Sequence, residues 1–149
     1  MFPGGELYAR NWKPRQPTVE VRIPRDRGLE HVAGAAALSV AEEAGLSSAQ
    51  AKDVQVAVRE ACAGLAGRFF VGACETVVVT LAIYPTSLRV VVLGDGRERS
   101  VEQAETALNA YDADISLGVL KALMDSVTVL VHGRHGFVVM MSKRRLPAG

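Results

Sequence analysis

The chain has 149 residues, of which 49% are hydrophobic and 22% are charged, a composition typical of a folded globular domain and not of a disordered chain. Its 17 basic and 16 acidic residues give a net charge of +1, so no overall field draws it to nucleic acid or to anionic lipid. The sequence lacks an apolar run long enough to cross a bilayer and a secretory signal. We therefore expect one cytoplasmic domain that binds neither nucleic acid directly nor a membrane.

Residues 1–17 are rich in proline, glycine and basic residues, which predicts an N-terminal arm. The arm is either a mobile end or a segment that packs onto the domain or onto a partner through Tyr8 and Trp12. Residues 18–23 alternate apolar and polar side chains, which predicts a half-buried strand. Pro24 ends this strand because proline has no amide to donate to a sheet.

Residues 28–44 predict a helix, and Gly45 occupies the position of a left-handed C-cap. Several alanines in this segment indicate close contact with another helix or with a sheet. The apolar positions that we expect to face the core are Leu29, Val32, Ala36, Val40 and Ala41.

The segment from Ser47 to Phe70 predicts a second helix, antiparallel to the first because almost no loop separates the two. Ser47 and Gln50 have the spacing of a capping box, in which each side chain accepts a hydrogen bond from the other residue's backbone amide. Spacings of three and four predict one buried face made of Val54, Val58, Ala61, Cys62, Leu65 and Phe69.

Glu60, Gly64 and Gly67 form a second stripe beside that apolar face. A glycine inside a helix costs about 1 kcal/mol relative to alanine, so Gly64 predicts close packing or a site. The chain has two cysteines, Cys62 and Cys74, which are too few for a disulfide framework. We expect both to be small core residues in a reducing compartment.

The second half of the chain predicts two hairpins separated by helices. In order, we expect strands at 76–83 and 88–93, helices at 98–109 and 115–124, and strands at 127–131 and 137–141. Asp114 is the expected N-cap of the second of these helices. A basic tail, residues 144–149, is expected to be solvated. The fold class is therefore α/β (α+β): a two-layer sandwich with a mixed, mostly antiparallel sheet covered on one face by helices.

Residues 53–65, DVQVAVREACAGL, resemble the central helix of the GHKL (histidine-kinase-like) ATPase superfamily. The likeness is to the branch that contains the anti-sigma factors and serine protein kinases of bacterial partner switching, and it extends over residues 18–143. By this resemblance Glu60 falls on a glutamate that acts as base or positions a water molecule. Gly64 falls where the family has an asparagine that coordinates magnesium.

Two further segments carry the resemblance. Residues 93–98, LGDGRE, lie where the family has a D-x-G-x-G box, so Asp95 matches the aspartate that recognises adenine, followed by Gly96. Residues 116–121, SLGVLK, lie where the family has a glycine-rich lid before a helix, and they keep one glycine, Gly118. Arg97 stands where the box would have its first glycine.

These departures fall on groups that phosphoryl transfer needs. Magnesium prefers octahedral oxygen ligands, and glycine has no side chain to supply one. A lid with one glycine offers fewer free amides to a triphosphate. The resemblance therefore implies a Bergerat-type fold with a degenerate ATP site, for which we expect no cofactor.

The function that follows is an anti-sigma-factor-like regulator that binds a sigma factor, an anti-anti-sigma (STAS-type) antagonist, or both, as a homodimer. The alternative is an active ATP-dependent serine/threonine kinase that uses ATP and Mg²⁺ to phosphorylate an antagonist protein. A third possibility is a structural dimer module in a larger signalling assembly.

Simpler interpretations stay open for several residues. Glu60 can be an ordinary exposed helix residue, and Asp95 with Gly96 can be a turn after a strand. His132 and His135 flank a turn, but zinc needs three or four protein ligands, so we expect no metal there. The basic run at 143–145 is expected to be a solvated end.

Overall fold

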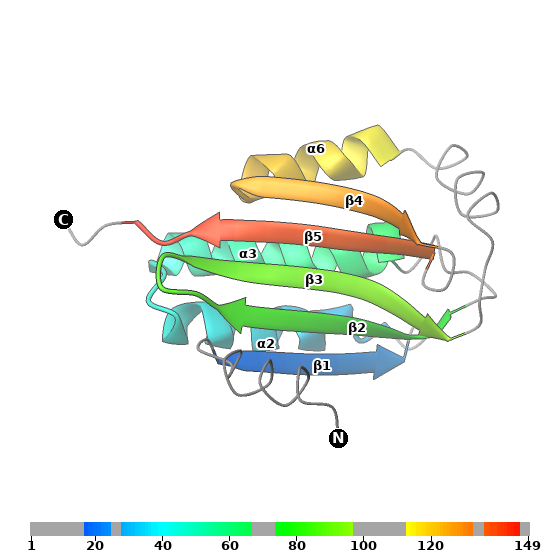
Figure 1. The fold of residues 1–149 in the computed structure, drawn as a ribbon, viewed down its shortest axis with the longest axis horizontal. Helices are drawn as coiled ribbons and strands as arrows, with labels where there is room; N and C mark the ends of the chain where they lie inside the picture. Colours follow the sequence, from blue (N-terminus) through cyan, green and yellow to red (C-terminus); the bar gives the residue numbers. More distant parts are fainter. Residues whose placement is uncertain (1–16, 25–27, 67–73, 97–112, 133–135, 147–149) are drawn as a thin grey trace, which may run out of the picture.

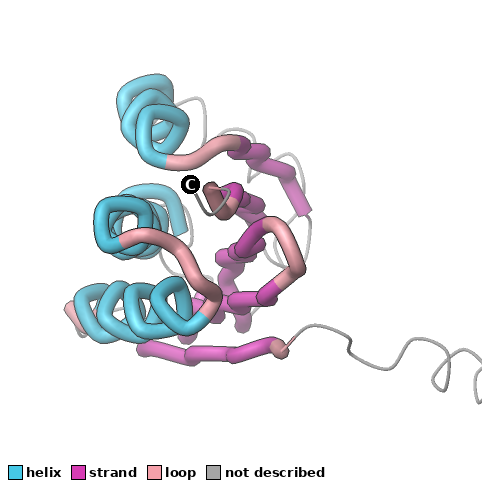
Figure 2. Tube along the Cα trace, turned by 90° about the vertical axis from the view of Figure 1, so that its left-hand side faces the viewer, coloured by secondary structure: helices cyan, strands magenta, loops and turns pink. Residues whose placement is uncertain are grey.

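The structure is a computed structural model that describes residues 17–24, 28–66, 74–96, 113–132 and 136–146. The described residues form one sheet with helices on one of its faces (Figures 1 and 2). In chain order the elements are β1 (Thr18–Pro24), α2 (Glu30–Glu43), α3 (Ser48–Glu60), the π-helical segment η1 (Ala61–Ala66), β2 (Cys74–Ile83), β3 (Ser87–Gly96), α6 (Ala113–Leu123), β4 (Ser126–His132) and β5 (Gly136–Arg144). The expected two-layer α+β fold is confirmed.

The five strands form one open sheet in the order β1-β2-β3-β5-β4. Every neighbouring pair is antiparallel, and the two expected hairpins, β2 with β3 and β4 with β5, are both present. In the first hairpin the amide of Tyr84 donates to the carbonyl of Ser87 at 2.8 Å. Because β5 pairs with β3, β4 is an edge strand among the described residues, at the opposite side of the sheet from β1.

The core lies between the sheet and the helices. Alternate residues of the central strands point toward the helices and are almost completely buried, and this pattern is the period of two that a strand imposes. These residues are Val77, Val79, Leu81, Leu88, Val90, Val92, Val139 and Met141. Burial of each such side chain stabilises the fold by roughly 1.5–3 kcal/mol, so this layer is the main source of stability.

Helix α2 ends at the residue that its sequence indicates. Gly45 has a φ of 86°, the left-handed conformation that a glycine adopts without a steric penalty. Its amide donates to the carbonyl of Glu42 at 3.0 Å, and the amide of Leu46 donates to that of Ala41 at 3.1 Å. This is the Schellman pattern, and it turns the chain back toward α3.

The buried face of α2 differs from the prediction. Ala33, Ala37 and Ala41 are completely buried, whereas Val32, which we expected to face the core, is 44% exposed. The stripe of small residues faces inward because α2 packs closely on both α3 and the sheet. Large side chains would hold these layers apart.

The capping box at the start of α3 is confirmed. The amide of Gln50 donates to Oγ of Ser47, and the amide of Ser47 donates to Oε1 of Gln50, both at 3.1 Å. The apolar face of α3 is also confirmed where side chains are described, since Val54, Val58 and Ala61 are completely buried.

Other predictions concern the ends of helices and strands, or segments that the structure does not describe. The expected helix at 98–109 and the arm through residue 16 lie outside the described residues. Asp114 lies within the first turn of α6 and is not its N-cap, because the helix begins at Ala113. The prediction of a solvated basic end is partly wrong. Strand β5 continues through Lys143 to Arg144, so these two residues belong to the sheet.

Helices α2 and α3 approach each other closely at Gly34. A Cβ atom on this glycine would lie 2.4 Å from Cγ of Arg59 and 3.2 Å from the backbone oxygen of Gln55. Real Cβ atoms essentially never approach that closely, so Arg59 and the neighbouring backbone of α3 must move if position 34 carries a side chain.

We expect Gly34→Val to lower the free energy of unfolding by about 1–3 kcal/mol, because the new side chain must push the two helices apart. Urea denaturation measures the change. Ala35→Val is the matched control, since Ala35 is the next residue of α2 and is exposed. If Gly34→Val is no less stable than Ala35→Val, the close approach of the helices is not as described.

Candidate functional site

Glu60 is the last residue of α3 and is half-buried. Directly after it the chain changes from α-helical to π-helical hydrogen bonding over Ala61–Ala66. Short π-helical segments that continue an α-helix are rare and are frequently found at functional sites. The change of helix type therefore marks the position of Glu60 independently of any sequence motif.

Gly64 lies inside η1. The expected stripe of Glu60, Gly64 and Gly67 assumed α-helical spacing throughout, and the wider π-helical turn breaks that spacing after Glu60. Gly67 lies outside the described residues.

Asp95 and Gly96 are the last two residues of β3. They pair with Thr76 and Cys74 of β2, with a register irregularity between these two partners. The interpretation of Asp95 and Gly96 as a turn after a strand is therefore wrong, because both belong to the ladder. Bulges of this kind occur preferentially at sheet ends and next to sites, where they redirect side chains.

Gly118 lies in the middle of α6, not in a loop before a helix. The amides that remain free to bind an anion are those of the first turn, and α6 begins at Ala113. The amide of Gly118 therefore falls beyond the part of the helix that can hold a phosphate. Gly118 is exposed, and a Cβ atom there would meet nothing within 4 Å, so its own packing does not require glycine.

The elements that carry these residues do meet. Segment η1, which continues α3, contacts β3, β5 and α6. Figure 1 shows the end of α3, the end of β3 and the start of α6 at the same end of the sheet. The sequence-predicted residues thus lie on neighbouring elements, although Gly118 lies further along α6 than the resemblance implies.

The described residues at this end of the sheet do not assemble a site for a magnesium ion. Gly64 has no side chain to act as a ligand. Among the described residues, no group of three or more His, Cys, Asp or Glu side chains could hold a metal ion. Magnesium binds through carboxylates and other oxygen ligands in near-octahedral geometry, which Glu60 and Asp95 by themselves do not complete.

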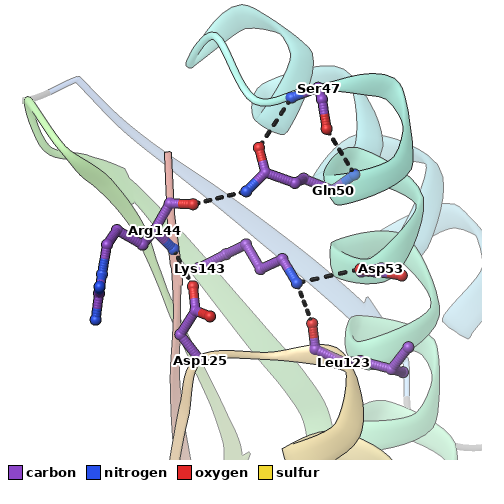
Figure 3. A network of polar contacts seen from close by, with 7 residues as sticks. All are labelled: Ser47, Gln50, Asp53, Leu123, Asp125, Lys143 and Arg144. Carbon is purple, nitrogen blue, oxygen red and sulfur yellow. Dashed lines mark hydrogen bonds and ion pairs between the residues drawn. The ribbon is translucent and has the colours of Figure 1, made fainter. Parts of the chain in front are cut away.

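A lysine from β5 ties the helices to the opposite end of the sheet (Figure 3). Nζ of Lys143 lies 3.1 Å from Oδ2 of Asp53 in α3, and it also donates to the carbonyl of Leu123 at the end of α6. The Lys143 side chain is only 11% exposed, so our expectation that it is a solvated residue is wrong. A cation beside the last carbonyls of a helix is also favoured by the helix dipole.

Neighbouring residues strengthen the same junction. Nε2 of Gln50, the capping-box residue, donates to the carbonyl of Arg144 at 2.7 Å. The amide of Arg144 in turn donates to Oδ2 of Asp125, which follows α6. Lys143 and Gln50 together fix α3 and α6 relative to the last strand. The capping pattern identified Gln50 from the sequence, although not its bond to Arg144, and no sequence pattern indicated the role of Lys143.

Cys62 is a core residue, as expected, and is 3% exposed. Burial, with a smaller contribution from the charge of Glu30, raises the pKa of its thiol from 9.0 to about 12. The thiol therefore stays protonated at neutral pH, and it is unsuited to act as a nucleophile. Its raised pKa favours the folded state below pH 9, and this contribution is lost as the pH rises toward 12.

Comparison with known protein families gives a match that covers most of the chain. Residues 24–143, most of the chain, match the family described as "Histidine kinase-like ATPase domain". A search of curated proteins gives no match. None of the described helices is long and apolar enough to cross a membrane.

We expect Lys143→Met to lower the free energy of unfolding by about 1–3 kcal/mol, because it removes the ion pair with Asp53 and leaves the carbonyl of Leu123 without this donor. Thermal or urea denaturation measures the loss. Lys121→Met is the control, since Lys121 is an exposed lysine of α6. Equal stability of the two variants would contradict the structural role of Lys143.

Proposed function

The chain belongs to the histidine kinase-like ATPase family, and we propose that within this family it is a regulator that acts by binding another protein. Its nucleotide site is degenerate in this proposal, and the surface of the intact domain carries the activity. The proposal places the protein in the cytoplasm, among the anti-sigma factors that its sequence resembles.

The observation that carries the proposal is the glycine at position 64. It lies one turn after Glu60, in the element that contacts β3 and α6, where the resemblance would have an asparagine that binds magnesium. Phosphoryl transfer depends on neutralisation of the phosphate charge by the metal and by positioned donors. Without a ligand here, we expect the metal to be bound weakly or not at all.

The position of Gly118 supports the same conclusion. Backbone amides bind phosphate at the start of a helix, where four of them lack partners within the helix. Gly118 lies past these positions, so its amide does not contribute to such a site.

The proposed partner is a sigma factor, a STAS-type antagonist of an anti-sigma factor, or both. The resemblance of residues 53–65 to the partner-switching branch supports this choice, and the family match is compatible with it. The net charge of +1 supports a protein partner and not direct binding to nucleic acid.

An active serine/threonine kinase is the second candidate. Glu60 favours it, since a half-buried carboxylate at the junction with a π-helical segment is suited to act as a base. Asp95 favours it as well, because it lies near the end of β3, which contacts that segment. This candidate requires ATP and Mg²⁺, and the missing ligand at Gly64 speaks against it.

Isothermal titration with Mg-ATP separates the two candidates. We expect no measurable heat at millimolar nucleotide, which corresponds to a binding free energy weaker than about −4 kcal/mol. A family member that keeps the asparagine provides the positive control. Micromolar binding would contradict the regulator proposal and support the kinase.

Replacement of the glycine alone should not create an enzyme. We expect Gly64→Asn to show no phosphorylation of a STAS-type substrate with labelled ATP, because Gly118 lies past the first turn of α6 and its amide does not hold a phosphate. Ala63→Asn, at the exposed neighbouring position, controls for the effect of a new asparagine on folding. If Gly64→Asn gains kinase activity and Ala63→Asn does not, the phosphate-binding part of the site is intact and our account of α6 is wrong.

A further inference from the structure

The two edges of the sheet differ in how they are protected against pairing with another strand. An edge strand presents unpaired amides and carbonyls, and proteins usually block it with charged residues or proline. Strand β1 is protected in this way: Arg22 and Glu20 form an ion pair at 2.9 Å on its outer face, and Pro24 ends it. Pairing at this edge would bury the two charges.

Strand β4 lacks both kinds of protection. Its seven residues, Ser126–His132, contain no proline and no Asp, Glu, Lys or Arg. Three valines and a threonine give it a high preference for sheet structure. Leu130 is 48% exposed, which makes it the most exposed large hydrophobic side chain described in any strand. An uncharged, β-branched edge of this length is suited to accept a further strand.

We propose that β4 pairs antiparallel with β4 of a second copy of this chain, about a two-fold axis at Val129. Each copy would then extend the sheet of the other. Two open five-stranded sheets become one sheet of ten strands, a size that open sheets do reach.

The sequence of β4 is complementary to itself in this register. Val129 faces its own copy, Thr128 faces Leu130, Val127 faces Val131, and Ser126 faces His132. Every residue of the strand gains a partner, and no pair brings like charges together. Because paired residues are an even number apart or identical, they lie on the same face of the sheet. The helices of both copies therefore lie on one side.

Apolar side chains next to β4, on both faces of the sheet, would also pack against the second copy. On the sheet face away from the helices, Val78, Leu93, Val138 and Leu130 are cross-strand neighbours in β2, β3, β5 and β4. This apolar row ends at the β4 edge, and pairing would extend it into the second copy. On the other face, α6 contacts β4 and carries Val119, which is 39% exposed.

The proposal does not depend on the function proposed above. A dimer formed through β4 leaves Glu60 and Gly64 outside the interface, since η1 contacts β3, β5 and α6 and continues α3. Such a dimer would present two copies of the partner-binding domain in a fixed two-fold arrangement.

Sedimentation velocity of the full chain over a wide concentration range tests the dimer, with two charge variants. One variant carries Thr128→Lys and Leu130→Lys, and the other carries Thr128→Glu and Leu130→Glu. These positions are exposed, so the monomer should fold, which circular dichroism verifies. We expect the unmodified chain to be a dimer and each variant alone to be a monomer, because like charges then face each other.

An equimolar mixture of the two variants should recover a species of twice the monomer mass, since opposite charges face each other across the axis. Val19→Lys on β1 is the control, because Val19 is 38% exposed at the opposite edge, and we expect it to leave the dimer unchanged. A monomeric unmodified chain, charge variants that remain dimers, a mixture that stays monomeric, or a control that dissociates would each overturn the proposal.

Discussion

The position of α3 across the middle of the sheet is the constraint on which the rest of the structure depends. Its valines Val54 and Val58 are completely buried in the same core cluster as Val90 and Val139 of the central strands. The helix is held at its start by the capping box and by the bond from Gln50 to the last strand. At its far end it runs directly into η1, which packs on β3, β5 and α6.

This arrangement gives the two ends of the sheet different characters. At one end, α3, α6 and β5 are held together by Lys143 and Gln50 (Figure 3). Lys143 contacts Asp53 and the carbonyl of Leu123, and Gln50 donates to the carbonyl of Arg144. At the other end, α3 ends at Glu60 and continues into a π-helical segment that contains Gly64. The stable end can fix the geometry of the other without depending on a bound nucleotide. A domain whose nucleotide site is degenerate, as we propose for this one, can therefore keep the fold of its family.

The parts of this structure that local chemistry determines were predictable. The Ser47–Gln50 capping box, the left-handed Gly45 and the alternating strands each depend on a few neighbouring residues, and the structure confirms them. The parts that depend on distant contacts were not. Val32 and Ala33 are both apolar, so the spacing of apolar residues does not tell which of them is buried. The close packing of α2 on its neighbours buries Ala33 and leaves Val32 exposed.

The same distinction applies to the candidate site. The resemblance placed Glu60 and Gly64 on one helix and Asp95 just after a strand. In the structure Asp95 lies within β3, and the elements that carry these residues do meet. The resemblance did not predict the π-helical segment, because hydrogen bonds of either helix type are compatible with a run of small residues. Lys143 and Asp53 are 90 residues apart, so no local pattern indicates their ion pair.

The central claim is that an intact histidine kinase-like domain acts here by binding and not by phosphoryl transfer. Native mass spectrometry of the chain mixed with a candidate sigma factor or STAS-type protein, with and without Mg-ATP, tests both parts of this claim in one measurement. We predict a complex in both conditions and no mass increase from a phosphoryl group on either protein. A partner that gains a phosphoryl group only when Mg-ATP is present would contradict the account.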